Sequence, residues 1–445
     1  MYQCPSAGGG LRAAGGLLPS PLMRRLLQLA APALAGIVVH AAVPAAASPV
    51  DLFGLGARGQ AMAGAVDSTA SGFEAAYYNP AGLAWDARPS FALGYQSATF
   101  ALDVNGVEQA TRDAPVLTIG FGVPLPLGGA LEDRLALGLA FAIPQNSILI
   151  ADITRPGDPS FVVVENRAQT VSVLGCLAVR VADWLSVGVG ALALAELSGD
   201  IAVAPNDEGK LGTRVKDELR ADYAFIAGLS LRPRPWLSLG LTWRSESTAR
   251  FSLPITADLG EDFGIPLPRL DITGTAQYDP AEAALGVGVR PAPWLLVAVS
   301  GVWQRWSEFP LPIGYTAVPA GTPPQPPPNF HDTVSVRLGL EGDFSVDGDL
   351  RLLPRLGASL EPTPVPDQTG FHNHLDGDRV VLSLGVGLVF GPLHLDLAGQ
   401  VHLLGERTSA KDPALVADPT TNPGAPSVTS AGTVLVGNLQ IGLEL

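Results

Sequence analysis

Apolar and polar side chains alternate along most of the chain after residue 90. The pattern is clearest in Arg379–Leu404, where every second residue from Val380 to Phe390 is large and apolar and the residues between them are mostly small or polar. Gly391-Pro392 forms a reversal, and the alternation then resumes. A period of two predicts a pair of antiparallel strands. The apolar face of such a pair packs on a core in a soluble sandwich, or faces lipid in a membrane barrel whose polar face lines a lumen.

The same alternation predicts fourteen strands in all. We expect them near residues 90–103, 115–123, 133–144, 168–181, 184–204, 221–232, 236–250, 268–290, 293–309, 332–343, 348–361, 379–390, 392–407 and 431–445.

The connections between these strands alternate in length. The long ones cover residues 104–114, 145–167, 205–220, 251–267, 310–331, 362–378 and 408–430, and each is followed by a short turn such as Ala182-Asp183 or Pro291-Ala292. Strict alternation places every long loop at one end of the sheet. Short periplasmic turns and long outer loops are typical of outer-membrane barrels. The sequence therefore predicts an all-β fold, a 14-stranded antiparallel transmembrane β-barrel over residues 90–445.

Charged and aromatic positions agree with a barrel. A charge on the lipid face costs roughly 2–4 kcal/mol at the bilayer midplane. The charged residues of the strands lie at the polar positions, which alternate with the large apolar ones. Trp184, Trp236 and Trp294 each follow a short turn, which predicts an aromatic girdle at one interface. The residues that place charge on the polar parity are Arg244, Arg337, Glu341, Arg351, Arg355, Asp396 and Glu444.

The amino terminus resembles a secretory signal. Met23-Arg24-Arg25 precedes an apolar stretch over residues 26–43 and small residues at 45–47, so we interpret 1–47 as an extension and a cleaved signal peptide. The chain has a formal net charge of −15, and removing three arginines with this segment gives −18. A barrel of this acidity is not expected to bind nucleic acid.

Residues 48–89 separate the signal from the first strand and lack alternation. Asn79 precedes Pro80, which suits the first position of a helix, so Asn79 is expected to cap a short turn over 81–85. Fourteen strands enclose a lumen too wide to be filled by wall side chains alone. We therefore predict that residues 48–89 form a small N-terminal hatch that plugs the lumen.

The predicted strand 133–144 has an unusual inner face. Its outward positions are large and apolar, whereas its inward positions are Ala136, Gly138, Ala140 and Ala142. A wall of small apolar residues can let a hydrophobic molecule pass, and it can equally make room for the plug. Both interpretations remain open at this stage.

Candidate chemistry is sparse. His372 and His374 share a loop with Asp376, which could suggest a metal site. A third well-spaced ligand is lacking. Cys4 falls in the extension, so Cys176 is expected to be a packed, unpaired cysteine. We predict no catalytic residue, no metal and no cofactor, and therefore a protein that is not an enzyme.

Several motifs resemble a known family. The segment GARGQAMAGAVDSTASGFEAAYYNPAGLA, with Asn79-Pro80-Ala81, looks like the amino-terminal hatch of the FadL/TodX family of outer-membrane transporters. Trp306–Phe309, Pro364–Asp367 and Asp376–Arg379 resemble further family motifs in the same order. The chain departs from the family in having Leu375 where a proline is usual and in ending in Leu445 rather than an aromatic residue.

The resemblance implies a passive transporter in the bacterial outer membrane. Long-chain fatty acids or similar lipophilic compounds would be captured near the extracellular loops and released sideways into the membrane through a gap at the third strand, with Ala136, Gly138, Ala140 and Ala142 as candidates for the opening. The expected partners are this ligand, outer-membrane lipids and the barrel assembly machinery, and the expected state is a monomer. No motif assigns a substrate-binding residue. The alternative function is a structural or adhesive barrel that acts through its surface loops.

Overall fold

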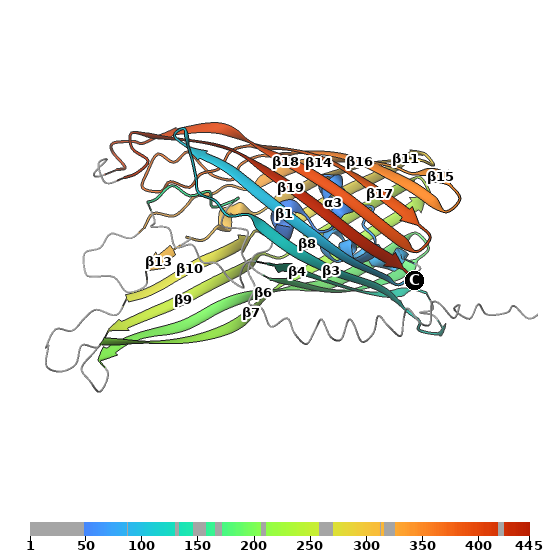
Figure 1. The fold of residues 1–445 in the computed structure, drawn as a ribbon, viewed down its shortest axis with the longest axis horizontal. Coiled ribbons are helices and arrows are strands. Elements are labelled where there is room, and N and C mark those ends of the chain that lie inside the picture. Colours follow the sequence, from blue (N-terminus) through green and yellow to red (C-terminus); the bar gives the residue numbers. More distant parts are fainter. Residues whose placement is uncertain are drawn as a thin grey trace, which may run out of the picture. The chain divides into compact units, whose positions relative to one another are not determined.

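Antiparallel strands form the wall of a closed barrel in the computed structural model of the protein (Figure 1). Among the residues that the structure describes, no helix is long and apolar enough to span a membrane. The predicted signal segment lies outside the described residues. These are 49–86, 88–129, 133–145, 157–164, 171–205, 211–257, 270–311, 313–315, 325–416 and 422–445.

Fourteen strands make up the barrel within the described ranges, as predicted, when interrupted strands are counted once. The barrel closes where the first strand pairs with the last, from Ser90↔Glu444 to Val104↔Ser430, side by side in Figure 1. The wall strands are β1 (Ser90–Val104), β3 (Ala114–Leu125), β4 (Leu135–Pro144), β5 (Ser172–Ala182), β6 (Leu185–Pro205), β7 (Leu211–Arg234), β8 (Leu237–Arg244) with β9 (Ser247–Ala257), β10 (Leu270–Asp279) with β11 (Glu282–Ala292), β12 (Leu295–Gln304), β14 (Thr333–Gly342) with β15 (Phe344–Asp347), β16 (Leu350–Glu361), β17 (Arg379–Phe390), β18 (Leu393–Ala410) and β19 (Ser427–Glu444). Two short strands, β2 (Val107–Glu108) and β13 (Ile313–Tyr315), lie in loops.

Two predicted strands are interrupted. The strand expected at 236–250 breaks between β8 and β9, where Ser245 Oγ accepts a hydrogen bond from Phe225 N at 2.8 Å. The strand expected at 268–290 breaks at Pro280, which has no N–H to donate to a ladder. The loops expected at 205–220 and 251–267 were wrong in part. Hairpin pairing continues to Pro205↔Leu211, and β9 extends to Ala257.

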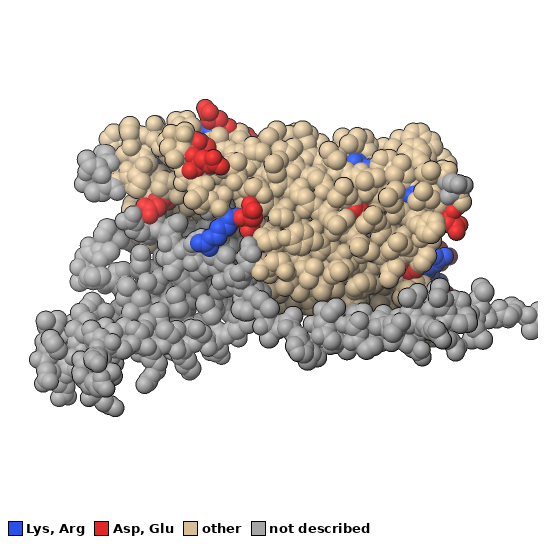
Figure 2. Space-filling view, viewed as in Figure 1, with Lys and Arg blue, Asp and Glu red and all other residues tan. Residues whose placement is uncertain are grey.

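The two faces of the wall follow the predicted parity. Outward side chains such as Leu384 (65% exposed) are apolar, whereas the inward Arg355 and Asp396 are buried. In Figure 2 the visible charged side chains lie toward the two ends, with a tan belt between them. Trp184, Trp236 and Trp294 are 50%, 52% and 49% exposed in the short turns before β6, β8 and β12. An apolar belt with an aromatic edge is what a lipid-facing barrel needs.

The segment before β1 lies inside the barrel, where Figure 1 draws it in blue. Nearly all of its residues are buried. Inward glycines let its backbone touch the wall, and a Cβ added at Gly188 would lie 2.5 Å from Ala81 N. We call residues 49–86 the hatch. It contains α2 (Pro49–Phe53), α3 (Ala57–Ala61), η1 (Gly72–Glu74), α4 (Ala75–Tyr78) and η2 (Pro80–Trp85).

Candidate functional site

The Asn79 turn fastens the hatch to the wall. Asn79 Oδ1 accepts a hydrogen bond from Ala81 N at 3.1 Å, so the predicted cap is present, and Pro80 opens the 3-10 helix η2. Asn79 Nδ2 donates to Asp67 O at 2.9 Å and to Leu229 O of β7 at 3.0 Å. Because Asn79 is fully buried, its loss would leave three backbone groups without partners.

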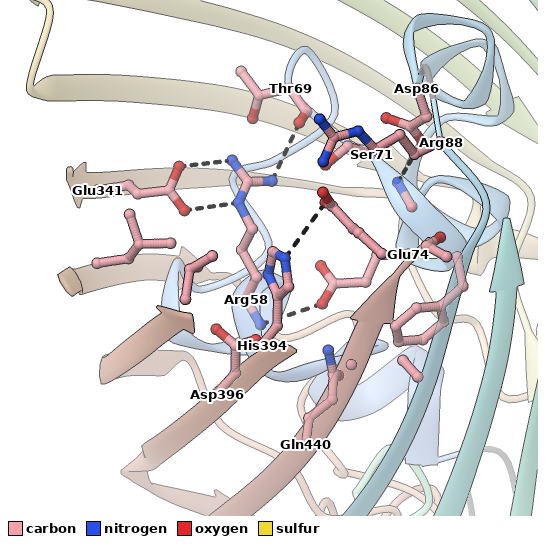
Figure 3. Close-up of a pocket in the computed structure, with 18 of the residues that line it drawn as sticks. Arg58, Thr69, Ser71, Glu74, Asp86, Arg88, Glu341, His394, Asp396 and Gln440 are labelled. Atoms are coloured by element: carbon pink, nitrogen blue, oxygen red, sulfur yellow. Dashed lines mark hydrogen bonds and ion pairs between the residues drawn. The ribbon is translucent and has the colours of Figure 1, made fainter. Parts of the chain in front are cut away.

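Arg58 of α3 is the centre of a buried ion-pair network (Figure 3). Its Nε and Nη2 lie 2.8 and 3.1 Å from the two carboxylate oxygens of Glu341 on β14. Arg355 of β16 donates to the same Glu341 carboxylate at 2.8 Å and to Asp396 of β18 at 2.5 Å. Such paired, charge-assisted hydrogen bonds fix geometry strongly. The network therefore joins the hatch to three wall strands.

Two hatch carboxylates accept backbone hydrogen bonds. Glu74 accepts from Arg58 N at 3.2 Å and from Gly59 N at 3.0 Å, at the start of α3. Asp86 accepts from Gly72 N at 2.6 Å. Burial raises the pKa of Glu74 to about 7, against the opposing effect of the Arg58 charge, and burial raises the pKa of Asp86 to about 6. Both carboxyl groups therefore titrate well above their ordinary range.

Arg244 of β8 provides a second ionic anchor. It donates to Asp51 of α2 at 2.7 Å and to Tyr77 O of α4 at 3.0 Å. Its guanidinium carbon lies 4.1 Å from the centre of the Tyr77 ring, and the Tyr77 hydroxyl donates to Asp51 at 2.8 Å. Arginine over an aromatic face adds a cation–π attraction. Both ends of the hatch are thus fixed to the wall by arginine.

A charged cavity of about 520 Å³ lies beside this hatch network, at the end of the barrel with the short turns. Figure 3 shows hatch residues on one side of it and wall residues, including Glu341, His394 and Asp396, on the other. Six arginines and six carboxylates line it, so its formal charges balance: Arg58, Arg88, Arg232, Arg290, Arg351 and Arg355 against Glu74, Asp86, Glu341, Asp343, Asp396 and Glu444.

The opposite side of the hatch is apolar. Leu52 and Phe53 of α2 belong to a buried hydrophobic cluster with residues of β1, β18, β19 and the loops. The Phe53 ring lies 6.1 Å from that of Phe100 and 5.4 Å from that of His402. We call this set the inner apolar cluster. Its members are Leu52, Phe53, Ala98, Phe100, Leu102, Val104, Phe161, Val164, Leu375, Leu404, Val428, Val434 and Val436.

A second cluster lies among the extracellular segments. Phe309 and Phe330 stack with ring centres 4.2 Å apart, and Trp306 and Tyr278 pack beside them. Val162, Val163 and Val365 complete the set, which we call the loop aromatic cluster. Residues 161–164 supply side chains to both clusters, so the two are adjacent.

Hydrogen bonds join three loops above these clusters. Ser160 N donates to Asn373 O at 3.0 Å, and Leu375 N donates to Ser160 O at 2.8 Å. Asn373 Nδ2 donates to Asn422 Oδ1 at 2.8 Å. Arg155 and Arg167, both in the predicted loop at 145–167, lie outside the described residues.

His374 has an apolar environment. It lies edge-on to Phe309 and Phe330, and its ring stacks on that of His372 with centres 4.7 Å apart. Neither ring nitrogen of His374 has a hydrogen-bond partner among the described residues. Burial lowers the pKa of His374 to about 3, and the charges of His372 and Lys411 act in the same direction. Within the described residues, no group of three or more His, Cys, Asp or Glu side chains could hold a metal.

The small residues of β4 face the hatch. Ala136, Ala140 and Ala142 are 3%, 0% and 0% exposed, and a Cβ added at Gly138 would lie 2.7 Å from Leu83 Cδ1. Pairing with β5 runs without a break from Leu135↔Val179 to Ala142↔Ser172. The structure thus places these residues against the plug, and their role in a lateral opening stays a prediction.

Sequence reasoning missed Arg58 and Phe53 of the hatch, and it placed Arg355 and Glu341 on the lumen face without identifying what they contact. Glu341 lies 283 residues beyond its partner Arg58. The alternation of the strand indicated that Glu341 faces the lumen, but alternation does not identify the residue that it contacts there. Cys176, predicted to be packed and unpaired, is buried and donates to Ala76 O of the hatch at 3.3 Å.

Comparisons with known proteins agree with this architecture. A family model described as outer membrane protein transport protein (OMPP1/FadL/TodX) matches residues 36–436. No curated protein matches the chain. A Pseudomonas aeruginosa FadL homologue of known structure is similar to it with a TM-score of 0.59 and 17% identity, covering 87% of this chain and 98% of that one.

Two further structures of transport channels are similar. The CymD monoaromatic hydrocarbon channel has a TM-score of 0.53 and 15% identity over 88% of this chain and 98% of its own. The P. putida toluene transporter TodX has a TM-score of 0.52 and 14% identity over 88% and 99%. At these identities the similarity establishes the fold alone.

Proposed function

The chain belongs to the outer-membrane transport family OMPP1/FadL/TodX, and from that premise we propose that it takes up hydrophobic molecules passively across the bacterial outer membrane. The observation that carries the proposal is the inner apolar cluster, which continues into the loop aromatic cluster. A lumen that serves polar solutes is lined by polar side chains. The inner apolar cluster consists mainly of leucine, valine and phenylalanine. We likewise assign residues 48–89 to the hatch and 90–445 to the barrel, and expect a monomer assembled by the barrel assembly machinery.

Capture is proposed to begin at the loop aromatic cluster. Phe309 is partly exposed and stacks on the buried Phe330, with the buried Trp306 beside it. A solute would then reach the inner apolar cluster, whose floor is Phe53 of the hatch. The hatch, tied to the wall through Arg58 and Arg244, favours transport over a surface barrel that acts only through its loops, because such a barrel has no need of a fixed plug.

Release is proposed to be lateral, beside β4. A hydrophobic solute gains about 0.8 kcal/mol per methylene when it moves from water into lipid, so no energy source is required. The charged cavity on the other side of the hatch, with its six arginines and six carboxylates, is a poor route for such a solute. The side chains of Ala140 and Ala142 give β4 a small inner face beside the hatch.

The substrate class is proposed to be lipophilic compounds with a small polar part or none, long-chain fatty acids and aromatic hydrocarbons among them. The similar structures include a monoaromatic hydrocarbon channel and a toluene transporter. The neutral His374 beside Phe309 and Phe330 can donate one hydrogen bond without adding charge. Competition between radiolabelled toluene and palmitate for uptake would rank the two classes.

A crosslink tests the lateral route. Leu137 and Leu177 are paired across β4 and β5 and lie on the lipid-facing parity, and opposed Cα atoms in antiparallel strands are about 4.5–5.5 Å apart, within reach of a disulfide. Leu137→Cys with Leu177→Cys, in a Cys176→Ser background, should stop toluene uptake into proteoliposomes until a reductant is added.

The matched control crosslinks another strand pair, separated from β4 by β1 and β3. Leu395 and Ile441 are paired across β18 and β19 and are 39% and 48% exposed. A disulfide between cysteines at these positions should leave uptake unchanged. Undiminished uptake with β4 and β5 locked would show that solutes leave along the barrel axis.

A further inference from the structure

A second cavity lies between the hatch and the periplasmic rim, and its charges are not balanced. It has a volume of about 360 Å³ and is bounded by Ser68 and Thr69 of the hatch and by the turn between β7 and β8. Arg232, Arg234 and Arg290 line it. We propose that this cavity is a binding site for a phosphate group.

Three arginines and no carboxylate line this smaller cavity. Two of them, Arg232 and Arg290, also line the cavity of about 520 Å³, where six arginines face six carboxylates. None of these three arginines has a carboxylate within ion-pair distance among the described residues. The charge of Asp86 acts on Arg232 from the larger cavity. In a protein of net charge −15, three arginines at one cavity without an ion-pair partner among the described residues favour an anion there.

Arg232 is held against the hatch, whereas Arg234 and Arg290 are exposed at the rim of the cavity. The Arg232 guanidinium carbon lies 4.8 Å from the centre of the Trp85 ring of the hatch, and Arg234 Nη1 donates to Pro233 O at 3.1 Å. Asp86, which lines the larger cavity, is engaged by Gly72 N. Arginine matches phosphate oxygens with two parallel N–H donors.

Hatch hydroxyl groups complete the site. Thr69 Oγ1 is buried and has no hydrogen-bond partner among the described residues. Ser68 is 3% exposed and approaches the wall closely, since a Cβ added at Gly288 would lie 3.0 Å from Ser68 Oγ. A buried hydroxyl without a partner is costly, and it could donate a hydrogen bond to a phosphate oxygen. Thr69 lines both cavities, and its hydroxyl without a partner is a second sign of a ligand beside the arginines.

The place of the cavity identifies two sources for this chemistry. Trp236, 52% exposed, also lines it and belongs to the tryptophan girdle at the membrane interface. The cavity thus lies at the level of lipid headgroups. A phospholipid of the inner leaflet and free phosphate of the periplasm would present the same group.

The test is calorimetric titration of the purified full-length barrel in a neutral detergent at constant ionic strength. One arm uses inorganic phosphate, and the other uses dihexanoyl phosphatidylglycerol. Arg290→Gln should weaken binding about tenfold, as expected for one lost charge-assisted contact. Thr69→Val, which keeps the side-chain shape, should weaken it by a smaller factor.

Arg134→Gln is the matched control. Arg134 also lies at the end of the barrel with the short turns, but it faces Asp183 at 3.7 Å and is not part of the cavity. It should bind as the native protein does. Binding in both arms supports a site for either source, and binding of the lipid alone assigns the phospholipid. Equal affinity of the native protein and Arg290→Gln, or no binding in either arm, would overturn the proposal whether or not the barrel transports hydrophobic solutes.

Discussion

The two halves of the lumen are held together by different physics. On the periplasmic side, the hatch meets the wall through the ion-paired Arg58, Glu341 and Arg355, whose side chains are 16%, 11% and 3% exposed. On the extracellular side, the hatch meets the wall and loops through Phe53 and the inner apolar cluster. Buried ion pairs depend strictly on geometry, whereas apolar contacts adapt to what fills them. The hatch is therefore fixed to the wall by ion pairs on its periplasmic side and presents an adaptable apolar surface on its extracellular side.

Deletion of residues 49–86 should have the largest effect, because it removes both the ionic and the apolar contacts between the hatch and the wall. Without the hatch, fourteen strands leave an open lumen, so single-channel conductance in planar bilayers should rise severalfold. Heat-modifiable migration on a gel would verify that the deleted form still makes a barrel. Conductance equal to that of the intact protein would place the obstruction in the extracellular loops.

Glu341→Gln should weaken the periplasmic half specifically. The change leaves Arg58 and Arg355 without their shared carboxylate, and breaking a buried ion pair costs about 3–5 kcal/mol. The free energy of unfolding, followed by tryptophan fluorescence in urea and phospholipid vesicles, should fall by that order.

Asp343→Asn is the matched control for this change. Asp343 pairs with Arg351, but the two side chains are 33% and 46% exposed, and an exposed pair is worth only about 0–1 kcal/mol. If both variants lost the same stability, burial would not be what distinguishes the hatch network.

Phe53→Ala should affect the extracellular half. Removing a buried phenylalanine costs about 3–5 kcal/mol in a core that cannot relax, but here a hydrophobic solute can occupy the space. We therefore expect a changed apparent affinity for toluene uptake with a smaller loss of stability than for Glu341→Gln. A loss of stability as large as that of Glu341→Gln, with unaltered uptake, would mean that Phe53 is ordinary core.

Acidification should produce a smaller effect on the periplasmic half. The pKa of Glu74 is about 7 in the docked hatch because of burial, against an ordinary value of 4.5. The folded protein therefore binds a proton between these values that the unfolded chain does not, so stability should fall as the pH rises from about 4.5 to about 7. Burial raises the pKa of Asp86 to about 6 and acts in the same direction.

Protease cleavage of the hatch, compared at pH 5 and pH 8, measures this effect. Cleavage should be slower at pH 5. Glu74→Gln keeps the shape of the side chain without its titration, so its pH dependence should be weaker. A native-like pH dependence in Glu74→Gln would assign the effect to other carboxyl groups.

The wall was predictable because its information is local. A period of two in residues such as Val380–Phe390 specifies which side chain faces lipid, and the structure confirms this parity. The Asn79 cap is local as well, since its partner Ala81 N is two residues away. These features need no knowledge of distant partners.

The interior was not predictable for the opposite reason. Ala57 N donates to Gln440 Oε1, 383 residues later, and Gln400 donates to Gln60 O, 340 residues earlier. Alternation predicts that Gln400 and Gln440 point inward but not what they meet there. The strand predicted at 221–232 was also too short, because β7 begins at Leu211 and pairs with β6 over residues whose sequence does not alternate.

The position of a bound solute tests the central claim most directly. Crystals of the full-length barrel soaked with bromotoluene would show the bromine by its anomalous signal. The division of the lumen predicts bromine among Phe53, Phe100 and Leu375, above the hatch. Bromine in the charged cavity beside Arg58 and Glu341, with none in the inner apolar cluster, would contradict it.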